Sequence, residues 1–556
     1  MIYAAPPYVR CQNENHAPRS RLPRAALMTA TFLIAMLIAF RAAPQTSDDV
    51  AQSVYPTLHC AYAELPTTWL PHNARLPVER QAAELLYSRL VRPVAGDAGY
   101  EPQLAVEFPL ALAKGRSFEL PHAPPAKWSD YSEQQPHLVT AADVAWTIRL
   151  LGREAMPGFS PAWSQALAGA GPAGADDPFT LSIRLARDHW DPLSFMHFAI
   201  LPKHRFPQGG TQQEWQAFDE QPLGSGPYRR AEHNDQMVRF VAGSDVPARP
   251  AIREITFHVL SPDEAVLQLY EKRLQLVADL PAALVKQVKE RGGRVVTLHP
   301  PSVWFLAPNF RHPAMQSQDL RLALAHAIDR KAILDAVFRP SGGESDHAEL
   351  TGPFPHDCWA YDADVPAFDG QQASPLADEA KRKLGNLPPL KLVYRASEPG
   401  AEQACRQMAA QVGKVGIELE LTGLSAAEFF PRVLDLHDFD LVYWRHDFSD
   451  QTFWLGGLLD PDPRSQARGG PNFLGYTPDA SVNEFFRDLA LHKRFVDLQR
   501  TMHKFHAHVA RTAIVIPLWQ LDTYLAIDDA LAGVELSPLT LFGDVANWRF
   551  KGGEGQ

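Results

Sequence analysis

The chain has 556 residues, a formal net charge of −11, 46% hydrophobic residues and 21% charged residues. This length exceeds what a single hydrophobic core supports, so we expect two or three lobes. The composition is that of a globular protein. The 48 prolines are nearly double the roughly 5% background, which favours many fixed loops and disfavours repeat arrays and coiled coils.

The first 41 residues differ from the rest, because they carry five arginines and one glutamate and contain an uncharged run at residues 25–40. As a helix this run spans about 24 Å, slightly less than the ~30 Å hydrocarbon core of a bilayer. We interpret residues 1–24 as a cytoplasmic basic tail and residues 25–41 as a signal anchor or signal peptide. Arg41 makes Ala42-Ala43 a poor cleavage site, which favours an anchor in the inner membrane and places the remaining chain on the extracytoplasmic side.

Without this leader the net charge is near −15, which argues against nucleic acid or anionic lipid as a partner. Cysteine gives little further information, because three of the four cysteines lie beyond the leader and make an odd number. A bridge between Cys358 and Cys405 is compatible with an oxidising compartment, and the sequence leaves their pairing open.

The first half of the exported part alternates short strands with helices. Residues 87–94 and 118–128 have the pattern of strands and turns, and Thr140 begins a helix with a capping-box pattern. Residues 169–177, rich in glycine and alanine, are predicted to form a small flexible loop. Residues 179–185 then alternate as a strand.

Further along, apolar spacing predicts helices in three regions and extended chain in two. We expect the helical regions at 263–291, except near Pro281, and at 320–337 and 482–510, and the extended segments at 303–310 and 514–519. Within 320–337 we predict two helical segments, the second capped by Asp329.

A β-α-β unit follows in the sequence. Residues 390–394 are apolar and β-prone, residues 401–414 have helical spacing, and residues 417–421 alternate like a strand. Ser425 caps another helical segment, and the chain then returns as a strand that ends at Trp444. Helical crossovers between these strands imply a parallel sheet.

The loop predicted at residues 445–450 would lie at the carboxyl edge of that sheet, where open α/β sheets bind their ligands. A carboxylate at Asp447 beside aromatic side chains suits a cationic ligand. Arg445 offers an alternative, since it can pair with Asp447 internally and so reserve or empty the site.

Several segments, taken in order, resemble the extracytoplasmic solute-binding proteins of ABC importers, specifically the dipeptide, oligopeptide and nickel group known as family 5. Lys127-Trp128-Ser129-Asp130 followed by Val139 to Val144 resembles the family's KWSDG…VTAEDV signature. Gly224 to Tyr228 resembles its G-T/S-G-P-Y turn, and Asp319 to Lys331 resembles its VRQALAYAIDRK stretch. The resemblance extends over roughly residues 54–548.

This resemblance implies an α/β fold of the class C (type II-like) periplasmic binding proteins, with two main lobes, an extra small domain and a ligand cleft between the lobes. Lobe I would consist of residues 54–85, 178–295 and 511–550, the small domain of residues 86–177, and lobe II of residues 296–510. The implied function is binding of a peptide or similar small, amine-bearing or cationic solute by lobe closure, for delivery to ABC permease subunits. We expect a monomer without cofactor, metal or catalytic activity.

The resemblance also implies the binding residues. In peptide-binding members, a GW-x-A-D-Y segment supplies an aspartate for the ligand's α-amino group and a tryptophan that lines the pocket. Here Asp447 and Trp444 occupy those positions. Arg445 and His446 are bulkier than the residues of the family pattern at these positions. The full set of candidate ligand-binding residues is Asp447, Trp444, Tyr443, His446, Arg445 and Trp454.

The alternative class of function is a sensory or scaffolding protein that kept the solute-binding fold without transport. A metal site at His503, His506 and His508 is disfavoured, because their spacing does not place all three on one helical face, and we expect a solvated helix there. A metal site at His446 and His437 is disfavoured as well. No G-x-S-x-G motif or marked Cys-His pair is present, so the sequence gives no reason to assign catalysis.

Overall fold

The computed structural model describes residues 57–551 apart from short gaps at 96–98, 113–114, 122–124, 154–163, 165, 175–176, 187–188, 244–248, 340–346, 386, 456, 461, 468 and 492–493. The predicted tail and signal segment lie outside the described residues. Among the helices that are described, none is long and apolar enough to cross a membrane.

Lobe I is built on a mixed sheet in which the described residues form seven strands, ordered β12-β19-β11-β1-β10-β9-β8. Apolar clusters cover both of its faces, which is why its central strands are buried. The strands are β1 (Thr57–Tyr62), β8 (Tyr228–His233), β9 (Met237–Ala242), β10 (Glu254–Val259), β11 (Leu276–Val277), β12 (Arg294–Leu298) and β19 (Thr523–Ile527). The helices of this lobe are α1 (Pro77–Leu86), α4 (Gln212–Glu220), α5 (Pro262–Tyr270) and α6 (Ala282–Glu290).

The small domain packs on lobe I and shares its main apolar core. It contains the sheet β4-β5-β7-β6, helix α2 and a hairpin of β2 and β3. Their bounds are β2 (Val91–Pro93), β3 (Tyr100–Pro102), β4 (Leu110–Leu112), β5 (Gly115–Glu119), α2 (Ala141–Leu151), β6 (Leu167–Gly174) and β7 (Asp177–Leu185). Because β7 pairs with β5 and β6, this domain extends beyond the sequence boundary at 177. The capping box predicted at Thr140 is present at the start of α2.

The loop predicted at residues 169–177 was wrong, because most of it is strand β6. Glycine and proline have low β-propensity, so the sequence shows no strand there. Pairing with β7 supplies the ladder, in which Ala170 lies opposite Ile183 and Pro172 opposite Leu181. Because β6 is an edge strand, Pro172 is tolerated in it.

Lobe II is a second mixed sheet, which in the described residues runs β14-β18-β13-β17-β15-β16. Its strands are β13 (Ser302–Pro308), β14 (Ala348–Glu349), β15 (Leu390–Arg395), β16 (Leu419–Leu424), β17 (Leu441–Asp447) and β18 (Ile516–Gln520). Its helices are α7 (Gln318–Ala327), α8 (Arg330–Ile333), α9 (Ala373–Leu384), α10 (Ala401–Gly413), α11 (Ala426–Phe430), α12 (Ala480–Leu491) and α13 (Phe495–Thr512). A short hairpin of β20 (Leu531–Ala532) and β21 (Arg549–Phe550) closes the chain in lobe I.

The predicted β-α-β unit is confirmed, because β15 pairs in parallel with both β16 and β17. Strand β17 continues three residues beyond Trp444, however, so Arg445, His446 and Asp447 belong to the strand and not to the predicted loop. The reason is antiparallel pairing with β13, in which Ser302 lies opposite Asp447. This pairing fixes the direction of each side chain at the cleft.

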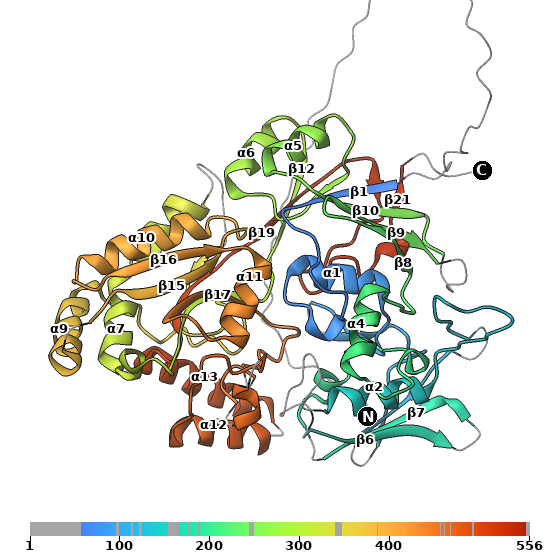
Figure 1. Cartoon of the computed structure of the whole chain (residues 1–556), viewed down its shortest axis with the longest axis horizontal. Helices are drawn as coiled ribbons and strands as arrows, with labels where there is room; N and C mark the ends of the chain where they lie inside the picture. The colour runs from blue at the N-terminus through green and yellow to red at the C-terminus, as the bar shows by residue number, and fades with distance from the viewer. Residues whose placement is uncertain are drawn as a thin grey trace, which may run out of the picture.

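Figure 1 shows lobe II, in yellow to red, beside lobe I and the small domain, in blue to green. Within the described chain, two short segments join the lobes: 299–301, between β12 and β13, and 521–522, between β18 and β19. They are tied together by His299 and Asp522, whose Nδ1 and Oδ1 atoms lie 2.9 Å apart. The second crossing falls about ten residues later than the sequence boundary at 511, because β18 belongs to the sheet of lobe II.

Candidate functional site

The carboxyl ends of four parallel strands meet between the lobes. In lobe I, β1 and β11 run parallel and lead to Glu64 and Asp279. In lobe II, β15 and β17 run parallel and end at Arg395 and Asp447. Ligands of open α/β sheets bind outside the carboxyl ends of strands, so this cleft is the candidate functional site.

Two adjoining cavities occupy the cleft, with volumes of about 170 Å³ and about 100 Å³. They share walls made by Pro77, Trp304, Arg395, Glu398 and Arg445. Both are smaller than the roughly 300–1,000 Å³ typical of drug-sized ligands, so the cleft in this form suits a small solute.

Asp447 lies in the larger cavity and already has three hydrogen-bond donors. Its Oδ2 accepts from Arg80 at 2.6 Å, and its Oδ1 accepts from Arg445 Nε at 2.7 Å and from Ser302 Oγ at 2.5 Å. Burial alone would raise the pKa of Asp447, but the guanidinium groups of Arg445 and Arg80 outweigh burial and hold this pKa well below its ordinary value. The internal pairing with Arg445 that the sequence left open is therefore present.

Arg445 connects Asp447 to the second cavity. Its guanidinium lies 3.7 Å from Glu398 and 5.0 Å from the centre of the Trp304 ring. Burial alone would lower the pKa of Arg445, but the carboxylates of Asp447, Glu398 and Asp279 raise it above its ordinary value. Arg445 is therefore a fixed positive charge held by several carboxylates.

Arg395 is the centre of a second charge network, which joins the lobes. It pairs with Glu398 on its own lobe and with Glu64 of lobe I. Ser397 Oγ also donates to Glu64 at 3.1 Å. Burial raises the pKa of Glu64, while Arg395 and Ser397 act in the opposite direction.

Asp279 follows β11 and lines the smaller cavity. Its φ of 50° lies in the left-handed region, which aspartate and asparagine tolerate better than most residues. Among the described residues, no hydrogen bond or ion pair involves its carboxylate. Burial raises the pKa of Asp279, and Arg445 and Arg395 lower it only in part.

Aromatic side chains close the larger cavity beside the charges. Trp444 packs on Phe473, with ring centres 4.5 Å apart, and on Phe429 at 6.0 Å. Tyr443 is buried, and its hydroxyl accepts from Trp519 Nε1 at 3.2 Å, so it is anchored in the core of lobe II. Burial lowers the pKa of His446 to about 4, which keeps the imidazole neutral at physiological pH.

Five of the six residues predicted from sequence thus line one cavity, namely Tyr443, Trp444, Arg445, His446 and Asp447. Trp454 lies outside both cavities, is 45% exposed and packs edge-on against Phe486. Sequence reasoning missed Glu64, Asp279, Arg395 and Glu398. The carboxyl-end rule applies to Arg395 and Glu398, which end or follow the predicted strand at 390–394. The rule could not identify Asp279, because β11 lies inside residues 263–291, where the helical prediction was wrong at Leu276–Val277. Sequence reasoning also missed Arg75 and Arg80, for which no local pattern exists.

The three histidines of α13 do not converge on one point, and His506 and His508 are buried, so the prediction of a solvated helix was wrong at these two positions. His506 faces Thr351 at 3.0 Å, His503 faces the carbonyl of Trp359 at 3.1 Å, and His508 lies 3.6 Å from Asp479. A different group has spacing suitable for a metal ion. Asp130 lies 2.9 Å from His204 and 3.2 Å from His137, and no donor atom of this trio is more than 4.8 Å from another.

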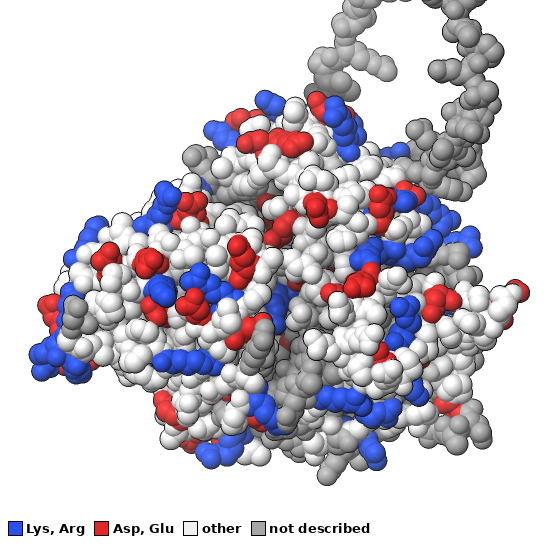
Figure 2. All heavy atoms as spheres, viewed as in Figure 1, with Lys and Arg blue, Asp and Glu red and all other residues white. Residues whose placement is uncertain are grey.

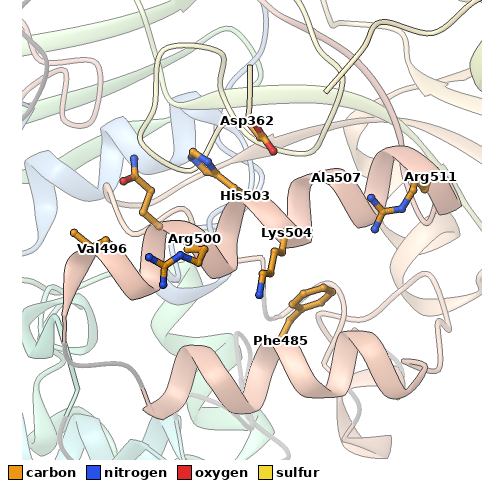
Figure 3. Close-up of a pocket in the computed structure, with 9 residues that line it drawn as sticks. Asp362, Phe485, Val496, Arg500, His503, Lys504, Ala507 and Arg511 are labelled. Carbon is orange, nitrogen blue, oxygen red and sulfur yellow. The ribbon is translucent and has the colours of Figure 1, made fainter. Parts of the chain in front are cut away.

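A larger hollow, about 560 Å³ in volume, runs along α13 on the outside of lobe II. Figure 3 shows Val496, Arg500, His503, Lys504 and Arg511 on this helix, with Phe485 on α12 pointing towards Lys504. The hollow is an open groove and lacks strand ends. For these reasons the smaller and less open cleft is the better candidate for a ligand site.

The fold has two lobes joined by two short crossings, with a cleft between the lobes at strand ends. This is the arrangement of a solute-binding protein. The chain belongs to the bacterial extracellular solute-binding proteins, family 5, whose middle-region model matches residues 123–465. The resemblance seen in the sequence is thereby confirmed.

Curated relatives agree. A probable di/tripeptide-binding protein 5 of Pseudomonas aeruginosa strain UCBPP-PA14 is 23% identical over 377 residues, which cover 64% of this chain and 68% of the relative. A dipeptide-binding protein of Pseudomonas aeruginosa strain PAO1 is 25% identical over 351 residues, covering 60% and 63%. The chain thus aligns with about two thirds of the length of these relatives.

Solved structures share the fold. The oligopeptide-binding protein AppA of Bacillus subtilis, in complex with a nonapeptide, superposes with a TM-score of 0.77 at 19% identity, covering 89% of this chain and 99% of AppA. AgaA of A. tumefacien R10, in complex with agropinic acid, superposes with a TM-score of 0.74 at 16% identity, covering 89% and 99%. The predicted α/β fold of the periplasmic binding proteins is confirmed.

Proposed function

We propose that this protein binds a small peptide or similar amine-bearing solute between its lobes and presents the closed form to the permease of an ABC importer. Membership of family 5 supports the solute-binding role. The names of the Pseudomonas relatives, which refer to di- and tripeptides, support the choice of solute.

The observation that carries this proposal is the charged cleft at the carboxyl ends of strands from both lobes. A solute that carries opposite charges finds carboxylates and guanidinium groups there, with Trp444 and Trp304 as apolar walls. Charge-assisted hydrogen bonds in such a site contribute about 1.5–3 kcal/mol each. A cavity of about 170 Å³ restricts the solute to a small one.

Closure of the lobes follows from differential contact. A ligand that touches both lobes binds the closed form more tightly than the open form and shifts the population towards it. The two short crossings between the lobes are the segments about which such a movement occurs. No covalent chemistry is required of the binding protein.

We further propose that the protein acts outside the cytoplasm as a monomer, held in the inner membrane by residues 25–41. The uncharged run and the arginines around it support this arrangement. Acidic and basic side chains are interspersed over the face shown in Figure 2, which presents no extended basic surface for nucleic acid.

Isothermal titration of the full chain in detergent with the standard dipeptides tests the function. We expect micromolar or tighter binding of one or more dipeptides and markedly weaker binding of free amino acids. If neither dipeptides nor tripeptides bind while the protein is folded by circular dichroism, the proposed ligand class is wrong.

A further inference from the structure

The cleft has two ends of opposite charge. The larger cavity is lined by four arginines (Arg75, Arg80, Arg395 and Arg445) and two carboxylates. The smaller cavity is lined by four carboxylates (Glu64, Asp279, Glu398 and Asp522) and two arginines. Since the two cavities share a wall, a ligand that spans them experiences a positive end and a negative end.

Asp447 is poorly placed to receive an ammonium group. A carboxylate offers about four acceptor sites, and three of them are occupied by Arg80, Arg445 and Ser302. An ammonium at the remaining site would approach two guanidinium groups that lie within 2.7 Å of the same carboxylate. Repulsion between these cations opposes its binding.

Asp279, unlike Asp447, has a carboxylate that is available to a ligand's ammonium group. Its carboxylate lines the negative end of the cleft and has no hydrogen-bond or ion-pair partner among the described residues. Glu64 and Glu398 line the same cavity and add negative charge, while Arg395 and Arg445 are already engaged by carboxylates. An ammonium beside Asp279 would compensate a buried charge that Arg445 and Arg395 compensate only in part.

The positive end of the cleft offers guanidinium groups to the ligand's carboxylate. Arg75 lines the larger cavity with its guanidinium 5.8 Å from the centre of the Phe430 ring. Within the described chain its side chain donates to Asn73 Oδ1 at 3.3 Å and has no carboxylate within ion-pair distance. Arg80 lies on the same wall and is 34% exposed at its side chain. A carboxylate of the ligand is therefore favoured at this end.

We propose that the ligand's ammonium group binds Asp279 and not Asp447, and that its carboxylate lies against Arg75 and Arg80. The inference rests on the proposed function and fixes the direction of the ligand in the cleft. Asp447 then acts as a positioning residue that holds Arg80 and Arg445, without touching the ammonium.

The test uses the tightest-binding standard dipeptide in three forms: free, N-acetylated and C-amidated. In Asp279→Asn, which keeps the shape and tolerates a φ of 50°, we expect Kd for the free dipeptide to rise about 10- to 100-fold and Kd for the N-acetylated form to stay unchanged. In Arg75→Gln, binding of the free acid should weaken while binding of the C-amide does not.

Asp447→Asn provides the matched comparison, and we expect it to alter binding of the free and N-acetylated forms by the same factor. If it abolishes the preference for the free amine while Asp279→Asn preserves that preference, the ammonium binds Asp447 and the inference is overturned, although the proposed function stands. The inference is also overturned if the unmodified protein binds the free and acetylated forms equally well. If no dipeptide binds, the proposed function itself is wrong.

Asp279→Gly is a second variant that keeps the test valid if Asp279→Asn misfolds, since glycine adopts positive φ without strain. It should reproduce the loss seen with Asp279→Asn. Melting temperatures of both variants in the absence of ligand establish that the effect concerns binding.

Discussion

Two buried carboxylates in the cleft show how neighbouring charges decide the state of a residue. Removal of water disfavours the ionised form of both Asp447 and Asp279. Asp447 is compensated by Arg445 and Arg80, so its pKa falls below the ordinary value. Asp279 lacks a comparable partner among the described residues, and its pKa rises. The first side chain is engaged by the protein, and the second is available to a ligand.

Glu84 on α1 makes this effect measurable through stability. Burial raises its pKa to about 7, although its side chain accepts from the backbone N–H of Phe542 at 2.7 Å. Because the native state favours the protonated form, the contribution of Glu84 to stability is highest below the unfolded pKa of 4.5 and falls as pH rises through about 7.

Glu84→Gln should therefore stabilise the protein at pH 8, by at most ~3 kcal/mol, and should have little effect near pH 4.5. Glutamine keeps an oxygen for the Phe542 N–H. Urea titrations of both proteins at the two pH values measure the difference, and Glu290→Gln, on the exposed end of α6, serves as control. An equal effect of Glu84→Gln at both pH values would show that charge burial is not the cause.

Among the elements, those whose local signals agreed with their packing were predicted from sequence. The strands of the β-α-β unit, the helix caps at Thr140 and Asp329, and the amphipathic helices near the C-terminus were all predicted. Each has a regular apolar period or a capping side chain, which acts through residues close in sequence.

Elements that depend on distant partners were predicted less well. Strand β6 exists through its pairing with β7, and the last three residues of β17 are held by β13. Pro431, awkward inside a predicted helix, ends α11 and begins a π-helical segment, Pro431–Asp435. For the two strands, the deciding contact is between residues far apart in sequence, which the apolar periodicity does not reveal.

The same reasoning explains how much of the site could be predicted. The stretch from Tyr443 to Asp447 was predicted because it follows a strand that alternates with helical crossovers. The partners that change its chemistry, Arg80 and Ser302, come from other parts of the chain. The role of Asp447 therefore depends on the folded molecule, and the sequence defined only its place at the sheet edge.

At the scale of the whole molecule, two guanidinium–carboxylate pairs among the described residues join the lobes across the cleft, and His197 of lobe I also lies 3.0 Å from Asp450 of lobe II. Arg80 of lobe I pairs with Asp447 of lobe II, and Glu64 of lobe I pairs with Arg395 of lobe II. The lobe II partners keep a second neighbour within their own lobe, Arg445 for Asp447 and Glu398 for Arg395. The cross-lobe bonds can thus be removed without leaving an isolated buried charge.

We expect the double variant Arg80→Gln, Glu64→Gln to open the lobes in the absence of ligand, because both guanidinium–carboxylate pairs across the cleft are lost while Asp447 and Arg395 keep their partners within lobe II. Small-angle scattering should show a larger radius of gyration than for the unmodified chain. The matched control is Glu379→Gln with Arg382→Gln, which removes a pair on the exposed side of α9. A radius that is unchanged in the double variant would mean that these pairs do not hold the lobes together.

The central claim is that a small amine-bearing solute occupies the cleft. Native mass spectrometry of the full chain, released from detergent and then denatured to identify what it carried, tests this most directly. We predict that a peptide or another small amine copurifies in one-to-one ratio with the protein. A chain that emerges empty and stays empty after incubation with di- and tripeptides would contradict the account.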